Sequence, residues 1–378
     1  MQSDIIIIGG GLSGLISAWQ LQSIGANLVI MEARTRFGGR ILTVGEEDGY
    51  DCDLGPSWIW PGQPLVASLL NHFNISYYDQ YVDGAVLLQQ MDGRVEKITG
   101  PSPMSGARRI QGGVSSLTDK IVSEIGASSQ FLSYRVTGLS INKDIITVDA
   151  AGPTGKLQAH AKQVGLAIPP RLGANLTFTP ELPRKTMQAL SETPTWMAGH
   201  AKFFAIYDQP FWRKMGLCGT VISQCGPLAE IHDASPDSGQ SFSLFGFSGL
   251  DAKSRSSMDR NEFNNLAISQ LAVLFGDEAK QPKAVYFQDW SREHFTARVD
   301  DRTPQLLHSR YDLSQDLGDA WDGNLEFISS ETAFRNGGLI EGALEAGLRF
   351  SRRIAGLKAP LVDDRYTPDS ANMNWDWN

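Results

Sequence analysis

The N-terminal residues alternate between short apolar runs and a segment with helical spacing. Residues 4–8 form a continuous run rich in isoleucine, which is typical of a strand buried on both faces. Apolar residues then recur at helical spacing between Leu15 and Leu21, and Gly25 is expected to end this helix. A second apolar run at 27–31 predicts another strand. This order predicts a strand–helix–strand unit.

The turn between the first strand and the helix carries the pattern G-x-G-x-x-G, formed by Gly9, Gly11 and Gly14. The first glycine permits a tight turn, the second lets a pyrophosphate approach the backbone, and the third lets the helix pack closely on the sheet. Free N–H groups at the start of the helix, around Leu12 and Ser13, would hold the phosphates. In this context the pattern predicts a dinucleotide site rather than a purely structural turn.

An acidic residue, Glu32, ends the second strand 18 residues after Gly14. Its carboxylate can accept both hydroxyls of an adenosine ribose and would repel a 2′-phosphate. The residues that follow form a second glycine-rich loop with several guanidinium groups. A flavin diphosphate buried along its whole length needs such a loop, whereas a nicotinamide dehydrogenase does not. The predicted FAD contacts in this loop are Ala33, Arg34, Gly39 and Arg40.

These motifs resemble the signature of the glutathione-reductase-like flavoproteins, in the branch that holds amine oxidases, carotenoid desaturases and protoporphyrinogen oxidases. Residues 53–58 resemble the segment beside the flavin ring, and 134–136 the strand that meets the adenine. Residues 325–347 resemble a closing motif at a second helix N-terminus, whose positive end would face flavin N1 and O2. The FAD contacts that this resemblance implies are Gly55, Pro56, Ser57, Trp58, Val136, Ser330, Glu331, Leu339 and Ile340.

The segment at 202–213, KFFAIYDQPFWR, is similar to the one in monoamine oxidases that carries a lysine. In those enzymes this lysine holds a water at flavin N5, and Lys202 occupies its place. Apolar neighbours would desolvate an unpartnered ammonium group; the alternative is a lysine whose stem snorkels from a strand edge. Trp290 resembles the tryptophan over the pyrimidine side of the flavin, with an ordinary core tryptophan as the alternative. Lys202 and Trp290 are therefore the predicted catalytic residues, by position.

Taken together, the chain is identified as a member of the flavin-dependent amine oxidase family, similar to monoamine oxidase. The resemblance implies hydride transfer from the carbon next to an amine nitrogen to flavin N5. Reoxidation by O2 would give H2O2 and an imine that hydrolyses to an aldehyde. Two alternatives stay open: a flavoprotein that acts in a complex on a partner protein or peptide amine, and a desaturase or oxidase of the carotenoid or porphyrin type.

The sequence departs from the family pattern at the substrate end. Val299 falls where covalent members carry the cysteine that bonds the flavin, so FAD is expected to be held non-covalently. Asp300 and Leu339 fall at the two aromatic positions of the amine cage and are the predicted substrate contacts. A carboxylate at Asp300 would suit a second cationic group, as in a polyamine or a peptide-borne amine. The segment between Trp58 and Gly112 is too short for the helical insertion of larger members, which predicts an open entrance, a large substrate, or closure by a partner subunit or a second copy.

The predicted fold is α/β, with a Rossmann-type FAD-binding domain interwoven with an α+β substrate-binding domain built on a mixed or antiparallel sheet. The FAD-binding domain is expected to use 1–75, 108–172 and 315–360, and the substrate-binding domain 76–107 and 173–314. A strand at 201–207 and a helix near 260–275 are expected in the latter. Residues 248–257 are expected to form a polar loop, and 361–378 a C-terminal tail.

The amino-acid composition limits the classes of partner that the protein is expected to bind. The 378 residues carry 33 Lys and Arg against 42 Asp and Glu, a net charge of −9. This balance argues against nucleic acid and against an anionic membrane surface. Three cysteines and six histidines make neither a disulfide framework nor a metal site. The chain has no basic leader and no apolar run long enough for a membrane anchor, so a soluble, cytoplasmic protein is expected.

Overall fold

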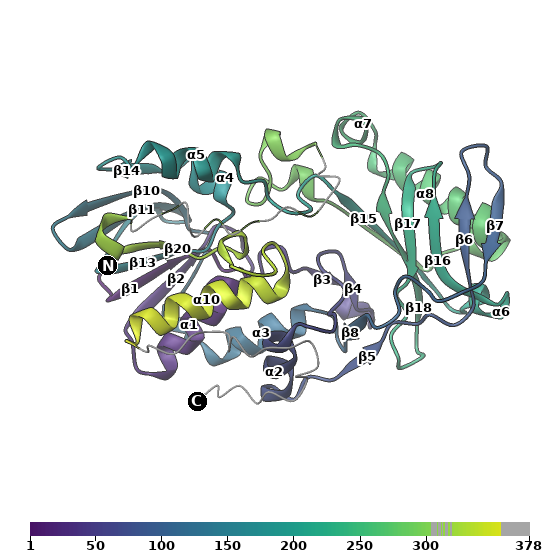
Figure 1. Cartoon of the computed structure of the whole chain (residues 1–378), viewed down its shortest axis with the longest axis horizontal. Helices are drawn as coiled ribbons and strands as arrows, with labels where there is room; N and C mark the ends of the chain where they lie inside the picture. The colour runs from purple at the N-terminus through teal and green to yellow at the C-terminus, as the bar shows by residue number, and fades with distance from the viewer. Residues whose placement is uncertain (304–307, 309–310, 312, 314–316, 318–319, 357–378) are drawn as a thin grey trace.

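The predicted strand–helix–strand unit lies at the centre of a five-stranded parallel sheet (Figure 1). The computed structural model describes residues 1–303, 308, 311, 313, 317 and 320–356. The unit consists of β1 (Ile5–Ile8), α1 (Leu12–Ser23) and β2 (Leu28–Glu32), and Gly25 follows the helix with a positive φ of 81°. The sheet order is β20-β13-β1-β2-β9, with β9 at Gln130–Leu132, β13 at Gln163–Leu166 and β20 at Leu325–Phe327.

The isoleucine run is continuous because both faces of β1 are covered. Ile5 and Ile7 pack in one core with four helices, and Ile6 and Ile8 pack in another with a second sheet. The helices on the first face are α1, α2 (Pro64–His72), α3 (Ser115–Glu124) and α10 (Ile340–Ile354). A Cβ at Gly347 of α10 would lie 2.4 Å from the Ser13 carbonyl oxygen, so this glycine lets α1 and α10 lie side by side.

The second face is covered by a four-stranded sheet of order β12-β11-β10-β14. Its strands are β10 (Arg135–Asn142), β11 (Ile145–Gly152), β12 (Gly155–Ala161) and β14 (Thr177–Thr179). Phe178 of β14 and Leu190 of α5 (Arg184–Glu192) are buried in the same core as Ile6. These two apolar residues, which follow the expected domain boundary at 173, therefore pack with the FAD-binding part. The short helix α4 (Pro170–Gly173) packs against α5.

The substrate-binding part is built on a seven-stranded mixed sheet of order β19-β15-β18-β17-β16-β6-β7 (Figure 1). The strands are β6 (Ala85–Gln89), β7 (Val95–Ile98), β15 (Ala201–Tyr207), β16 (Leu217–Ser223), β17 (Leu228–Asp233), β18 (Phe242–Ser248) and β19 (Ala284–Asp289). One face packs on α8 (Arg260–Phe275), which confirms the strand and helix predicted there. Phe204 and Phe245 lie on the opposite face. The short α6 (Phe211–Lys214) follows β15.

Two small sheets join the two parts: β3 (Thr43–Val44) with β4 (Cys52–Asp53), and β5 (Tyr77–Asp79) with β8 (Arg108–Ile110). The expected polar loop at 248–257 is wrong in part, because it contains α7 (Ala252–Ser256). Asp251 caps this helix by accepting a hydrogen bond from the Ser254 N–H at 2.7 Å. The predicted tail 361–378 lies outside the described residues. Within the described ranges, no helix is long and apolar enough to span a bilayer.

Candidate active site

A cavity of about 1030 Å³ lies between the two parts of the molecule. Its wall is formed by the β1–α1 turn, the loop after β2, residues 54–58, strands β15, β17 and β18, and the start of α10. Most of the residues predicted from the sequence line it: Gly9, Gly11, Leu12, Ser13, Glu32, Ala33, Arg34, Gly39, Arg40, Gly55, Pro56, Ser57, Trp58, Val136, Lys202, Trp290, Ser330, Leu339 and Ile340. Segments far apart in the sequence therefore meet around one space.

The glycine turn leaves an open cradle at one end of this cavity. Gly9 has a φ of 105°, which favours glycine. A Cβ at Gly14 would lie 2.0 Å from the Gly9 carbonyl oxygen, and Gly14 does not line the cavity, so its role is close packing. A Cβ at Gly11 would meet its nearest atom, Gly39 Cα, only at 4.0 Å. The backbone at Gly11 is thus free to be approached from the cavity.

The Glu32 carboxylate is buried and fixed beside this cradle. Its Oε2 accepts a hydrogen bond from the Gly10 N–H at 2.7 Å, and its Oε1 accepts one from the Arg34 N–H at 2.8 Å. The Arg34 guanidinium donates to Glu293 Oε2 and to Thr296 Oγ1, at 3.1 and 2.7 Å. Arg34 thereby ties the dinucleotide end to the segment after Trp290, while its side chain still lines the cavity.

Arg40 and Ser330 form the wall where the second glycine-rich loop meets the closing motif. Arg40 Nη2 donates to Ser330 Oγ at 2.9 Å, and Arg40 Nη1 lies 2.7 Å from Glu331 Oε1. Burial alone would lower the pKa of Arg40, but the Glu331 carboxylate more than offsets this and raises it. Glu331 itself is fully buried and does not line the cavity. It is thus a positioning residue for Arg40 rather than the direct FAD contact that the sequence predicts.

Lys202 projects from β15 into the cavity, not to the outside. Its side chain is almost fully buried, and Nζ donates to the Gly55 carbonyl oxygen at 2.9 Å and to Ser57 Oγ. Nζ also lies 4.3 Å from the centroid of the Phe245 ring. Burial lowers the pKa of Lys202 well below its ordinary value, and the Asp53 carboxylate opposes this in part. A lysine that snorkels from a strand edge is therefore excluded.

A buried ion pair behind residues 54–58 was missed by sequence reasoning. Arg109 Nη2 lies 3.5 Å from Asp53 Oδ2, and both side chains are almost fully buried. Asp53 Oδ1 accepts hydrogen bonds from Thr43 Oγ1 at 2.7 Å and from the Val114 N–H at 2.8 Å. This pair fixes the chain that leads into Gly55. No local pattern could have found it, because its two members lie on different strands, β4 and β8.

Trp290 lies on the cavity wall at the end of β19. Its Nε1 donates to the Leu54 carbonyl oxygen at 2.9 Å, and its backbone N–H donates to the His200 carbonyl oxygen at 3.0 Å. Burial and the nearby Arg255 charge lower the pKa of His200, so this cavity-lining imidazole is neutral at pH 7. Trp290 is thus fixed by both parts of the molecule.

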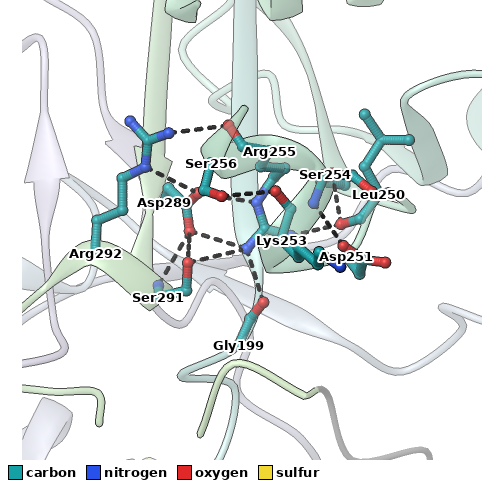
Figure 2. A network of polar contacts seen from close by, with 11 residues as sticks. Gly199, Leu250, Asp251, Lys253, Ser254, Arg255, Ser256, Asp289, Ser291 and Arg292 are labelled. Atoms are coloured by element: carbon teal, nitrogen blue, oxygen red, sulfur yellow. Dashed lines mark hydrogen bonds and ion pairs between the residues drawn. The ribbon is translucent and has the colours of Figure 1, made fainter. Parts of the chain in front are cut away.

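The position of Trp290 depends on a network centred on Arg255 of α7 (Figure 2). Arg255 Nε and Nη2 donate to the Asp289 carboxylate at 3.0 and 2.9 Å, and Nη2 also donates to the Gly199 carbonyl oxygen at 2.8 Å. Asp289 in turn accepts from the Ser291 N–H at 3.0 Å, which caps the 3₁₀ turn Trp290–Arg292. Arg255 therefore connects the two segments that carry Trp290 and His200.

Asp300, a predicted substrate contact, does not line this cavity. It lies in the 3₁₀ turn Val299–Asp301 beside a separate pocket of about 50 Å³. Its neighbour Val299 lines the main cavity but is also exposed. Leu339 does line the main cavity, as predicted. Glu230 is the carboxylate found on the seven-stranded sheet there, and sequence reasoning missed it. Nothing in the sequence of β17 distinguishes this acid as a residue of the cavity wall.

The residues present fit a flavin dinucleotide. Helices α1 and α10 both begin at this cavity, and neither is capped by the side chain of its N-cap residue, Gly11 or Leu339. Uncapped helix N-termini favour anionic groups. The cavity is also long enough to connect the Glu32 end with Lys202 and Trp290. Among the residues with described positions, no cluster of His, Cys, Asp or Glu could hold a metal ion.

Comparison with known proteins supports this geometry. Residues 87–355 match the model of the flavin containing amine oxidoreductases, and 7–73 match that of the NAD(P)-binding Rossmann-like domain. Mouse flavin-containing amine oxidase B is 24% identical, over 99% of this chain and 90% of the relative. A probable flavin-containing monoamine oxidase A of Dictyostelium discoideum is 22% identical, over 93% and 97%.

Solved structures show the same fold. A putrescine oxidase bound to putrescine superposes with a TM-score of 0.80 at 21% identity, covering 94% of this chain and 99% of the other. Cyclohexylamine oxidase from Brevibacterium oxydans gives a TM-score of 0.80 at 17% identity with the same coverage. The chain therefore belongs to the flavin-containing amine oxidoreductase family, with FAD as its cofactor.

Proposed function

We propose that this enzyme oxidises the C–H bond next to the nitrogen of a neutral amine and passes the electrons to O2. When bound, FAD supplies the two-electron acceptor and the centre that reacts with O2. The overall reaction balances as R–CH2–NH2 plus O2 giving R–CH=NH plus H2O2, after which water converts the imine to an aldehyde and ammonia. The observation that carries this proposal is that the buried Lys202 lines the same cavity as the glycine cradle.

Residues of the FAD-binding part would hold most of the cofactor. Glu32 would accept the ribose hydroxyls, Arg40 and Ser330 would contact the diphosphate, and the N-terminus of α10 would favour negative charge on the ring. The binding would be non-covalent. In support, none of the three cysteines lines the cavity, and Val299 lies on its wall where covalent members carry the thiol.

The groups around Lys202 would bind and orient the amine. Trp58 and Phe247 line the cavity and would exclude water from the reacting carbon. The Trp58 Nε1 donates to Gln80 Oε1 at 2.8 Å, which fixes its ring. Lys202 would hold a water molecule and assist the proton transfers that accompany O2 reduction. The lowered pKa of His200 makes its imidazole a weaker base than that of a free histidine, which suits direct hydride transfer better than proton abstraction.

An amine on a partner protein or peptide is a second candidate substrate. The specific observation is that the short segment after Trp58 does not supply a covering domain: Leu65, Val66 and Leu69 of α2 are buried in the FAD-binding core instead. An uncovered entrance would admit a bulky substrate, or would be closed by a partner subunit or a second copy of this chain.

Peroxide release tests the proposal. The purified protein would be incubated aerobically with monoamines, polyamines, amino acids and lysine-containing peptides, and H2O2 and aldehyde would be measured. We expect equal amounts of both from at least one of these classes. No product from any amine, with turnover of a carotenoid or tetrapyrrole donor, would instead establish the desaturase alternative.

A further inference from the structure

A small polar pocket of about 50 Å³ lies beside the main cavity, and His200 separates the two. Met197 and His200 line both spaces. Asp300 and Thr303 line the small pocket only, and both are exposed. The pocket therefore adjoins solvent through these two residues and the main cavity through His200.

His200 lies on the same face of the chain as Lys202. It directly precedes β15, and its carbonyl oxygen accepts the Trp290 N–H, so the pairing of β15 with β19 extends to this residue. Residues two apart on an extended strand point to the same face, with their backbones roughly 7 Å apart. Both side chains line the main cavity. The imidazole is thus the next cavity-facing side chain before Lys202 along this strand.

Two buried polar atoms of residues that line this pocket have no hydrogen-bond partner among the described residues: Thr195 Oγ1 and His200 Nδ1. Thr195 is only 4% exposed, and its N–H donates to Asp301 Oδ1 at 3.0 Å, which fixes the residue. Buried hydroxyl and imidazole groups are normally hydrogen-bonded. A volume of about 50 Å³ suits one or two water molecules, each of which takes about 30 Å³ in the liquid. Water is therefore the ligand that fits the size and the polar atoms of the pocket.

The charged groups around the imidazole are nearly balanced. Arg171 Nη1 lies 2.5 Å from Asp301 Oδ1, so the buried carboxylate of the pocket is paired. Asp300 adds a negative charge on the exposed side. Burial and the positive charge of Arg255 lower the pKa of His200. A proton taken up by this imidazole is therefore readily released.

We infer that His200 and water in this pocket carry a proton from solvent to the Lys202 end of the main cavity. This inference rests on the proposed function. Forming H2O2 from O2 takes two electrons and two protons; the reduced cofactor supplies both electrons and one proton, and the second proton arrives along this route. The imidazole accepts a proton at Nδ1 from the pocket water and releases one from Nε2 toward the cavity, so its charge is unchanged after each transfer. The Thr195 hydroxyl orients that water, which regains its proton from solvent.

Chemical rescue of the reaction with O2 tests this inference. The holoenzyme would be photoreduced anaerobically, so that no amine is needed, and mixed with O2 in a stopped-flow instrument. His200→Ala should slow reoxidation of the flavin by about 100-fold, and added imidazole should restore the rate in proportion to its concentration. An unchanged rate in His200→Ala, or a slow rate that imidazole does not raise, would overturn the inference, because a merely structural role gives no such rescue.

Thr195→Val removes the hydroxyl and keeps the shape of the side chain. It should slow reoxidation by about 10-fold, the effect of one lost hydrogen bond. Thr154→Val, in the exposed turn between β11 and β12, is the matched control and should leave the rate as in the wild type. Should His200→Ala fail to bind FAD, an unchanged rate in Thr195→Val would overturn the inference.

A measurement without turnover separates this inference from the proposed function. In protein labelled with ¹⁵N-histidine, the ring-nitrogen NMR signals of His200 are those that His200→Gln lacks. Thr195→Val should shift the Nδ1 signal of His200, because the water that bonds this nitrogen loses its second partner, whereas Thr154→Val should not. Identical His200 signals in Thr195→Val and wild type would overturn the inference even if amine oxidation were established. Failure of every amine to reduce the flavin would reject the proposed function and change neither of these signals.

Discussion

At the scale of single residues, the site combines buried charges whose partners are fixed by the fold. Lys202 is buried beside four aromatic rings, and its amine donates hydrogen bonds to the Gly55 carbonyl oxygen and the Ser57 hydroxyl. Burial lowers the pKa of this amine, so it gives up its proton more readily than an exposed lysine does. This is the property that O2 reduction to H2O2 requires at the cavity wall.

Lys202→Met should slow the reaction of the reduced enzyme with O2 by about 100-fold, within the range of a positioned acid–base group. Methionine keeps the volume of the side chain and removes its proton and charge. Stopped-flow mixing of the anaerobically reduced enzyme with O2 measures this step directly. Lys97→Met, at an exposed position on β7, is the matched control. An unchanged rate in the Lys202 variant would remove its assigned role.

Glu341 gives the molecule a pH-dependent stability. Its carboxylate accepts from the Leu65 and Val66 N–H groups at 2.9 Å each, but burial raises its pKa to about 7. Because the folded state holds this proton more tightly than the unfolded state, the contribution of Glu341 to stability is fully present below pH 4.5 and is lost as the pH rises through about 7. The shift from 4.5 to about 7 corresponds to about 3 kcal/mol.

Glu341→Gln should therefore remove part of the pH dependence of the unfolding free energy between pH 5 and pH 8. The difference in Tm between wild type and variant should favour the wild type more at pH 5 than at pH 8. Glu124→Gln, an exposed acid at the end of α3, should leave the slope unchanged. Parallel curves for wild type and Glu341→Gln would show that this carboxylate is not protonated on folding.

At the scale of elements, sequence patterns predict those helices and strands whose formation depends mainly on residues close together in the chain. The β1–α1–β2 unit, β15, α8 and α10 all form where periodicity and glycine spacing indicate them. The short α7 was missed, since a five-residue polar helix has no periodicity and is stabilised by Asp251 and by the distant Asp289. Asp300 lies in a 3₁₀ turn and does not line the cavity, and a sequence pattern does not show such a turn.

Arg255→Met should destabilise the protein by about 3–5 kcal/mol, because it removes the nearest ion-pair partner of the buried Asp289 carboxylate and leaves only the more distant Arg292. The loss should be smaller when Asp289→Asn is added, since the unpaired charge is then absent. Thermal unfolding of the two single variants and the double variant measures this coupling. Arg255→Met should also raise KM, because the network that positions Trp290 is lost. Arg255→Lys should reverse part of this increase. If the change in Tm of the double variant equalled the sum of the two single changes, the pairing of Arg255 with Asp289 would be contradicted.

At the scale of the whole molecule, the cavity exists because two parts with separate cores meet along one face (Figure 1). Glu32, Gly55 and Lys202 could be predicted as site residues because each stands in a motif that resembles one of the family. The pairs that hold them were not: Arg109 with Asp53 and His232 with Glu230 are brought together by strand order and register. Sheet order also places β14, which follows the expected boundary at 173, beside β10 of the FAD-binding part.

The residues that line the cavity predict that FAD is bound non-covalently. Denaturation of the holoenzyme with acid or heat should release all of the flavin into the supernatant, since no cysteine lines the cavity. The supernatant absorbance and the mass of the precipitated chain measure this. Flavin that stays with the chain, as an added mass of one FAD, would contradict non-covalent binding.

The central claim is that FAD in this cavity oxidises an amine and returns the electrons to O2. The most direct measurement is an anaerobic titration of the purified holoenzyme with butane-1,4-diamine, followed by admission of O2. We predict that one equivalent of amine bleaches the flavin absorbance and that O2 restores it with release of one H2O2 per flavin. A flavin that stays oxidised with this amine and with every other amine tested would contradict the account.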